Sequence, residues 1–386
     1  MRLGRAVTVA PALRGQCLEA LVERTPGVRE VQKQLLLCRA GEGAAQEGLG
    51  RQLARERSEA AVSVLRAADV VVASLVGAGH EQLTALMQEH QLRFSTVVID
   101  EATQAVEPAC LIPLHQGARR LVLVGDQCQL PPTVTSVDAR RAGLGRSLFE
   151  RLVLGGLPPQ VLTLQFRMHP ALAAFSSQNF YNGCVTSFPP PAARPPPPGF
   201  PWPDAALPMA WVHVRRNAAL GDEGSPPDSA SYHNHPEVRV LAEAVVRLIA
   251  AGVPPGEIGV MAPYSAQVNC LNEAINHQLS QAIPGAVGLV ECASVDAFQG
   301  REKEVMLMST VRSNAVASLG FLTDWRRLNV ALTRARSGLI LVGDAVTLQA
   351  DRYWLRLLEH CRGHGVVMDA DALLALFEAE PLQAVM

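Results

Sequence analysis

Short, unbroken apolar runs recur along most of this chain, and they restrict its fold more than any other feature. Each run is followed by polar residues and then by a stretch of helical character. The runs occupy residues 70–73, 97–99, 121–124, 161–164, 258–261, 305–308 and 339–342. Apolar strands of this kind are typical of a parallel sheet that is covered on both faces. Their alternation with helices predicts an α/β fold.

A glycine- and proline-rich break at residues 155–159 separates two sets of apolar runs. Such a cluster indicates a connection between compact regions. We therefore expect a first domain over residues 1–157 and a second over residues 158–370. Residues 371–386 are expected to form a C-terminal helix or tail.

Two segments differ from the strand–helix pattern around them. Residues 16–68 are charged and helical, with a glycine-rich break at 41–50, and predict a helical insertion in the first domain. Residues 188–208 contain two proline runs and predict an extended surface loop instead of a core element.

Composition excludes several classes of protein. The net charge of −2 over 386 residues gives no sign of a basic tail, although a local basic groove remains compatible with it. The eight cysteines show no Cys-x-x-Cys spacing, which argues against a zinc site and against a disulfide framework. No apolar run reaches the length of about 18 residues that a membrane span needs.

Two adjacent acids, Asp100 and Glu101, follow the apolar run at residues 97–99. Ligands of open α/β sheets bind at the carboxyl ends of the strands, where these acids are expected to lie. One carboxylate suits a bound Mg²⁺, and the other can deprotonate an attacking water. A solvated turn is the alternative interpretation of the pair when it is taken alone.

A second strand end carries a more specific string. The run at residues 121–124 leads into Gly125-Asp126-Gln127-Cys128-Gln129-Leu130-Pro131-Pro132. Further polar motifs follow later runs in the chain, at residues 165–170, 262–267, 294–302 and 326–336. In this order and spacing the chain resembles the superfamily 1 helicases over about residues 68–365. It is most similar to the up-frameshift helicases of nonsense-mediated decay.

The resemblance implies two RecA-like parallel-sheet domains that hydrolyse ATP with Mg²⁺ and move along single-stranded RNA. DNA is the alternative substrate, because relatives within the family act on either nucleic acid. The resemblance also implies a monomer in the cytoplasm, with the nucleus as the alternative, and no membrane association. A module that binds nucleic acid or a protein partner without turnover is the rival interpretation.

The family resemblance assigns roles in ATP binding and hydrolysis to matching residues. The implied catalytic residues are Asp100, which also holds the metal, Glu101, Gln129, Arg167 and Arg334. The implied nucleotide-binding residues are Phe166, Gly300, Glu302, Gln104 and Asp126. Arginine suits a transferring phosphoryl group because its planar, permanently charged fork binds oxygens in pairs.

Three of these assignments have alternatives in ordinary structural roles. Arg334 is expected on a helix together with Arg327 and Ala331, where it could instead stabilise the helix C-terminus. Phe166 is expected to stack on adenine, and a core phenylalanine is the alternative. Glu302 is expected to hold the ribose, and an ion pair with Lys303 or Arg301 is the alternative.

Nucleic acid is expected to contact both domains through backbone amides and one aromatic ring. The residues that the resemblance implies are Ser74, Val76, Gly77, Pro131, Pro263, Tyr264, Ser294 and Asp296. Among them, Tyr264 is expected to stack on a base.

One family motif is missing from this sequence. The phosphate loop Gly-x-x-Gly-x-Gly-Lys-[Ser/Thr] does not occur, and the only lysines are Lys33 and Lys303. Residues 7–11 resemble the family's next motif in degraded form. We therefore expect a first domain without its phosphate-loop strand, a chain that begins downstream of the loop, and no ATP turnover by these 386 residues alone. The corresponding hypothesis is that Met1 is an artefact of a gene model or transcript.

Overall fold

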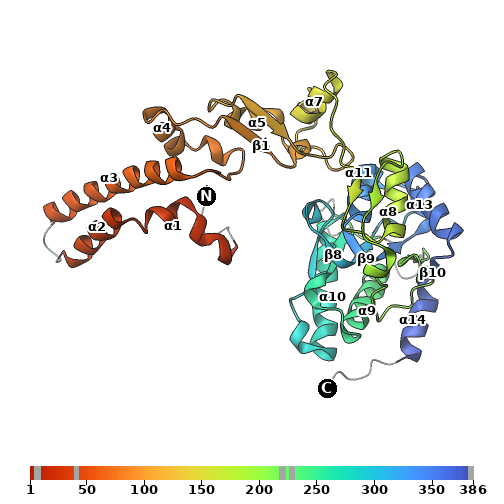
Figure 1. Ribbon diagram of the computed structural model, residues 1–386. Helices are drawn as coiled ribbons and strands as arrows, with labels where there is room; N and C mark the ends of the chain where they lie inside the picture. Colours follow the sequence, from red (N-terminus) through yellow and green to blue (C-terminus); the bar gives the residue numbers. More distant parts are fainter. Residues whose placement is uncertain (4–9, 39–42, 217–222, 226–230, 381–386) are drawn as a thin grey trace. The chain divides into compact units, whose positions relative to one another are not determined.

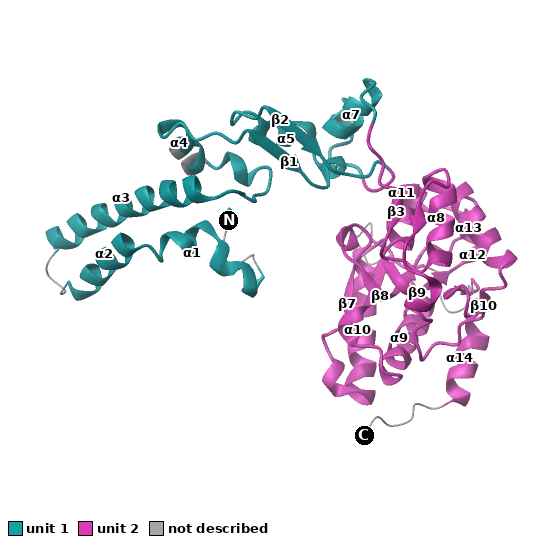
Figure 2. Cartoon of the chain, viewed as in Figure 1, with its two compact units in different colours: residues 1–127, 131–158 teal, residues 128–130, 159–386 magenta. Residues whose placement is uncertain are grey.

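The computed structural model describes residues 1–3, 10–38, 43–216, 223–225 and 231–380 (Figure 1). Its chain divides into two compact units, coloured separately in Figure 2. Unit 1 contains Met1–Gln127 and Pro131–Pro158, and unit 2 contains Cys128–Leu130 and Pro159–Met386. The division lies within the glycine- and proline-rich stretch 155–159. The expected short motif at residues 7–11 lies mostly outside the described residues.

Unit 1 begins with a helical layer whose core is small. The helices are α1 (Leu18–Val22), α2 (Pro26–Leu37) and α3 (Gly43–Ala67). Val28, Val31 and Leu53 are among the few buried side chains between them. The prediction of a glycine-rich break is wrong for residues 43–50, which form the first two turns of α3. Alanine, glutamine and glutamate interleave with these glycines and favour the helix.

The sheet of unit 1 has two parallel strands, β1 (Thr96–Ile99) and β2 (Arg120–Leu123). The remaining helices of the unit are α4 (Glu81–Glu89), α5 (Glu107–Leu114), α6 (Val137–Arg141) and α7 (Leu148–Leu154). The prediction that both faces of the sheet are covered is wrong for unit 1, because Val98 is 62% exposed and Val122 is 42% exposed. The run at residues 70–73 is not a strand either, since it makes only an isolated bridge at Val72.

Unit 2 is built on a six-stranded parallel sheet in the order β10-β5-β9-β8-β6-β7. Its strands are β5 (Met209–His213), β6 (Ile258–Ala262), β7 (Glu291–Ser294), β8 (Lys303–Ser309), β9 (Ala335–Gly343) and β10 (Val367–Asp369). The apolar runs at residues 258–261, 305–308 and 339–342 are thereby confirmed as strands. The run at 161–164 is mostly not a strand, because only Leu164 joins the short pair β3 (Leu164–Gln165) and β4 (Thr186–Ser187).

Helices cover this sheet on both faces, as Figure 1 shows. They are α8 (Pro170–Phe180), α9 (His235–Ala250), α10 (Ser265–Ala282), α11 (Trp325–Leu332), α12 (Ala345–Leu348), α13 (Arg352–Gly363) and α14 (Ala370–Ala379). Successive residues of β8 belong to opposite cores: Met306 packs with α8, α11 and α13, and Leu307 packs with α9 and α10. Two-sided burial explains why the central strands read as continuous apolar runs.

The proline-rich segment 188–208 is not a plain surface loop. Phe200 and Leu207 are buried and belong to the two cores of unit 2. The Trp202 indole donates a hydrogen bond to the Pro197 carbonyl at 2.7 Å. A Cβ at Gly338 on β9 would lie 2.9 Å from the Trp202 ring, so glycine lets the segment pack against the strand.

Among the described residues, no helix has the length and apolar character that crossing a membrane requires.

Candidate nucleotide and nucleic-acid sites

The two predicted acids of unit 1 lie in one tight turn after β1. Asp100 is exposed, and its Oδ1 accepts a hydrogen bond from the Glu101 amide at 3.0 Å. Glu101 has a φ of +50°, and its Oε2 accepts from Gln104 Nε2 at 2.9 Å. A non-glycine residue in the left-handed region is strained, and such strain is found preferentially at functional sites. The structure therefore brings Asp100, Glu101 and Gln104 together.

The end of β2 adjoins this turn. The Ala102 amide donates to the Val124 carbonyl at 2.8 Å, and the Val124 amide donates to the Ile99 carbonyl at 2.8 Å. Asp126 follows two residues later and is half-buried. Because the carboxyl ends of parallel strands share one edge of the sheet, Asp126 lies at the same edge as Asp100.

Gln129 is separated from these acids by the division into units. Residues Cys128–Leu130 pack with unit 2, where Asn329 donates to the Cys128 carbonyl at 2.8 Å and the Cys128 thiol donates to the Phe180 carbonyl at 3.2 Å. The motif at residues 125–132 is thus divided between the two compact units.

The described residues contain no group of three or more His, Cys, Asp or Glu side chains that could hold a metal ion. Asp100 nevertheless fits Mg²⁺, because this ion takes one or two protein carboxylates and completes its shell with phosphate oxygens and water.

In unit 2, two arginines from distant motifs converge on Thr333. Arg167 Nη1 donates to the Thr333 carbonyl at 3.0 Å, and Arg334 Nη2 donates to the Thr333 hydroxyl at 2.8 Å. Arg167 Nε also pairs with Glu302 Oε2 at 2.5 Å. Arg167, Glu302 and Arg334 therefore form one cluster. The expected alternative partners of Glu302, Lys303 and Arg301, both pair with Glu291 instead.

The expected helical position of Arg334 is wrong. Helix α11 ends at Leu332, and Arg334 lies in the turn before β9 with only 2% of its surface exposed. Its Nε donates to the Val330 carbonyl at 3.0 Å and its Nη1 to the Arg301 carbonyl at 3.3 Å. The first bond satisfies a carbonyl in the last turn of α11, which is the structural role considered as the alternative. Gly300, with a φ of +75°, forms the turn that precedes Arg301.

The turn that carries Phe166 and Arg167 is organised by Gln165. The Gln165 side-chain carbonyl accepts from the amides of Arg167 and Met168, each at 2.8 Å. Phe166 is 59% exposed, which excludes the interpretation as a core residue, and its ring centroid lies 4.8 Å from that of Phe188. The pair offers an apolar, aromatic surface beside Arg167.

Three residues of this site were not singled out from the sequence. Gln165 lies within the recognised motif at residues 165–170, so its amide side chain could have been identified from the sequence. Phe188 and Arg194 belong to the proline-rich segment, where Arg194 Nε donates to the Arg167 carbonyl at 2.8 Å. Nothing in the local sequence connects that segment with residues 166 and 167.

The nucleic-acid candidates of unit 1 surround a short turn. The Ser74 hydroxyl accepts from the Gly77 amide at 3.1 Å, and a Cβ at Gly77 would lie 2.7 Å from that hydroxyl. Val76 is 70% exposed. Pro131 is half-buried farther along the unit.

The candidates of unit 2 follow the neighbouring strands β6 and β7. Pro263 is half-buried, and the Ser294 hydroxyl accepts from the Ala297 amide at 3.2 Å. Asp296 is bound by Arg327 through two bonds of 2.9 and 3.1 Å. Tyr264 is only 3% exposed, so the expected base stacking on its ring is wrong for this conformation. Burial between other aromatic rings leaves no open face for a base.

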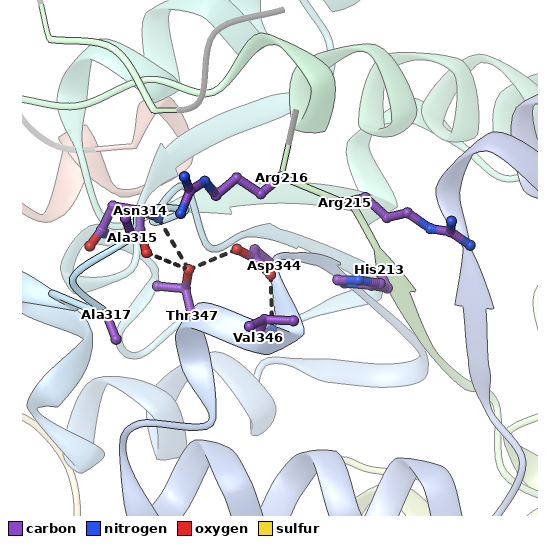
Figure 3. Close-up of a pocket in the computed structure, with 9 residues that line it drawn as sticks. All are labelled: His213, Arg215, Arg216, Asn314, Ala315, Ala317, Asp344, Val346 and Thr347. Atoms are coloured by element: carbon purple, nitrogen blue, oxygen red, sulfur yellow. Dashed lines mark hydrogen bonds between the residues drawn. The ribbon is translucent and has the colours of Figure 1, made fainter. Parts of the chain in front are cut away.

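A cavity of about 410 Å³ opens at the carboxyl ends of β5 and β9 (Figure 3). It is lined by His213, Arg215, Arg216, Asn314, Ala315, Ala317, Asp344, Val346 and Thr347. Arg215 pairs with Asp369 at 2.9 Å, and the buried Asp344 accepts from Thr347 at 2.7 Å. The sequence did not predict this cavity, because its lining comes from several separate segments outside the recognised motifs.

Comparison with known proteins connects these sites with a family. Two family models, each described as an AAA domain, match residues 23–137 and 144–346. Regulator of nonsense transcripts 1 from Dictyostelium discoideum is 40% identical over 314 residues, covering 80% of this chain and 22% of that protein. The Arabidopsis thaliana homolog is 42% identical over 313 residues, covering 79% of this chain and 24% of that protein.

A further relative carries an activity in its name. ATP-dependent helicase NAM7 from Saccharomyces cerevisiae is 40% identical over 308 residues, covering 79% of this chain and 30% of that protein. The chain thus spans about a quarter of the length of the curated relatives it matches. With both AAA-domain matches and this level of identity, the chain belongs to the superfamily 1 helicases that include the regulators of nonsense transcripts.

Proposed function

We propose that this chain supplies motor elements of an ATP-dependent helicase that moves along single-stranded RNA. The observation that carries the proposal is the convergence of Arg167 and Arg334 on Thr333. Arg167 is partly exposed beside an aromatic pair and suits the stabilisation of a transferring phosphoryl group, while the buried Arg334 holds the turn to which Arg167 is bonded. DNA is the alternative strand, because backbone contacts alone do not distinguish the two.

The acids of unit 1 have the complementary role in this proposal. Asp100 would hold Mg²⁺, which offsets charge on the phosphate oxygens when it is bound. Glu101 would take the proton of the attacking water, and Gln104 would orient its carboxylate. Asp126 would bind the nucleotide from the end of β2, and Gln129, which belongs to unit 2, would couple nucleotide binding to that unit.

The nucleotide contacts of unit 2 follow from its arginine cluster. Phe166 would stack on the adenine, with Phe188 supporting its ring. Glu302 would accept from the ribose hydroxyls while it holds Arg167 in place. Gly300 provides the turn from which Glu302 projects.

Backbone contacts supply the grip on RNA in this proposal. Exposed or half-buried turns at Ser74, Val76, Gly77, Pro131, Pro263 and Ser294 would present main-chain groups to the strand. Such contacts do not read base identity, so the binding should depend steeply on salt and weakly on sequence.

We also propose that these 386 residues do not hydrolyse ATP by themselves. The family's phosphate loop uses backbone amides and one lysine to hold the phosphates. Lys33 lies exposed on α2, and Lys303 binds the Gly256 carbonyl at 2.6 Å and Glu291 at 3.1 Å. In this proposal unit 1 is a RecA-like domain without the phosphate-loop strand, and the chain alone acts as an RNA-binding module.

The test compares this chain with a longer one that carries the phosphate loop. We expect both to bind single-stranded RNA and only the longer one to release phosphate. In the longer chain, Glu101→Gln should abolish phosphate release while ATP binding is kept. Arg167→Ala should slow hydrolysis by about 10³-fold with RNA affinity unchanged. Arg239→Ala, an exposed arginine on α9, is the matched control.

A different experimental result would contradict each part of the proposal. ATP turnover by the 386-residue chain would disprove the assignment of a missing phosphate cradle. Failure of both chains to bind RNA would disprove the motor itself. Loss of RNA binding with normal hydrolysis in Arg167→Ala would move Arg167 from the phosphate to the strand.

A further inference from the structure

Phe321 is an exposed aromatic residue whose ring is tilted against that of the buried Tyr264. Its side chain is 54% exposed, and the two ring centroids lie 5.4 Å apart. We propose that Phe321, and not Tyr264, is the residue on which a base of single-stranded nucleic acid stacks. This inference rests on the proposed function, because it names a contact within the same strand-binding surface. An accessible aromatic face is the chemical requirement for base stacking.

Tyr264 forms a rigid support under this ring. The Tyr232 centroid lies 5.3 Å from that of Tyr264, and Arg312 Nη1 donates to the Tyr264 hydroxyl at 3.2 Å. Arg312 in turn pairs with Glu223 at 2.7 Å, and both of these charged side chains are more than 90% buried. A buried, hydrogen-bonded charge pair cannot move without a large desolvation penalty. The support is therefore formed before any strand binds.

Gly320 allows Phe321 to reach this position. Its φ is +57°, and a Cβ there would lie 2.5 Å from the Tyr264 hydroxyl and 2.7 Å from Arg312 Nη1. Only glycine combines that backbone conformation with so close an approach. The next residue is consequently held against the Tyr264 ring.

The segment that leads to Phe321 is braced at its base by Asn314, whose hydrogen bond to Thr347 is drawn in Figure 3. The Asn314 side chain accepts from the Ser318 backbone amide at 2.8 Å and donates to the Ser318 carbonyl at 2.9 Å. The Asn314 backbone amide donates to the Thr347 hydroxyl at 3.1 Å. Thr347 is held by Asp344 at 2.7 Å. Because the loop is fixed, stacking on Phe321 would require little additional ordering.

A positive charge lies over the Phe321 ring. The Arg327 guanidinium is 5.4 Å from the Phe321 ring centroid and is oriented by Asp296. In this arrangement Arg327 faces a phosphate of the stacked nucleotide, and Asp296 positions Arg327 instead of touching the strand. The geometry thus combines a π-face with a cation, which is how sequence-tolerant single-strand sites are built.

The experiment measures binding of a fluorescent single-stranded oligouridine by the full chain at several salt concentrations. Phe321→Ala should weaken binding by about 5- to 100-fold, and Phe321→Trp should retain it. Because no charge changes, the slope of log Kd against log salt should stay the same for both variants. Arg327→Ala should reduce that slope.

The matched control is Val316→Ala, which alters an 82% exposed apolar side chain in the same loop. Its affinity should equal that of the wild type. Wild-type affinity in Phe321→Ala would overturn the inference while leaving the proposed function intact. Absence of oligouridine binding by the wild type would instead overturn the proposed function, and this inference with it. Equal thermal unfolding midpoints would show that the variants are folded.

Discussion

The sheets of the two units arise from the same kind of sequence and differ in how they are packed. In unit 2, Val305, Leu307, Ile340 and Val342 are fully buried, because helices cover both faces of the sheet. In unit 1, the corresponding apolar strands leave Val98 and Val122 exposed. In these two sheets the apolar runs form parallel strands, but the number of neighbouring elements determines whether a strand is buried.

The difference extends to polar groups. Among the described residues of unit 1, the buried polar side chains are Thr103 and Ser147, neither of which is charged. Unit 2 buries Glu237, Arg312 and Arg334 within hydrogen-bonded networks. Groups buried in this way can be held in a fixed orientation. Arg334 is thus rigidly positioned, whereas Asp100 projects from a thinly packed sheet.

The largest effect that we predict concerns the buried carboxyl of Glu237. Burial raises its pKa to about 8, against opposing hydrogen bonds from Ser309 and from the Val311 amide. The folded state therefore retains a proton that the unfolded state loses above its ordinary pKa. Stability is fully present below pH 4.5 and is lost as the pH rises through 8, by up to about 5 kcal/mol.

Glu237→Gln should remove this loss, because the amide stays neutral at every pH. The measurement is the free energy of unfolding of both proteins from pH 5 to pH 9. Glu243→Gln, on the same helix with a partly exposed carboxylate, is the control and should keep the wild-type profile. A wild-type profile in Glu237→Gln would show that the carboxyl is charged in the fold.

The second prediction compares how much stability is lost when one strand side chain in each of the two sheets is truncated to alanine. Trp211 on β5 is fully buried, and its ring meets that of Trp354 edge to face at 6.1 Å. Trp211→Ala should lower the free energy of unfolding by about 3–5 kcal/mol, because it leaves a cavity in a two-sided core. Val98→Ala on β1 should change it by about 0.5 kcal/mol or less. Denaturant unfolding of each variant measures both, and a comparable loss at Val98 would contradict the comparison.

Sequence reasoning identified β6, β8 and β9, whose two faces are covered, but it missed β5, which is buried to the same degree. The runs in β6, β8 and β9 are continuous because every side chain in them is buried. β7 was missed because its residues, including Glu291 and Ser294, are only partly buried and carry polar side chains. β10 was missed because it is a short edge strand of three residues.

The order of the motifs identified the site residues. The local sequence could not predict which groups surround their side chains. Arg334 was found by its motif, but its burial depends on the Val330 and Arg301 carbonyls that surround it. Tyr264 was found in the same way, yet Tyr232, Arg312 and Phe321 enclose it from three other segments. Such enclosure is a property of tertiary packing, so Phe321 emerges as the accessible ring only in the structure.

The third and smallest effect comes from one substitution made in both units. Gly338→Ala in unit 2 would place a methyl group 2.9 Å from the Trp202 ring, which its own hydrogen bond to Pro197 holds in place. We expect a loss of about 1–3 kcal/mol from this overpacking. Gly48→Ala lies within α3 of unit 1, where a Cβ meets nothing within 4 Å. Alanine favours the helix over glycine, so stability should rise there by about 0.5–1 kcal/mol. Thermal unfolding followed by circular dichroism should show midpoints that move in opposite directions, and a shared direction would mean that both units tolerate added volume equally.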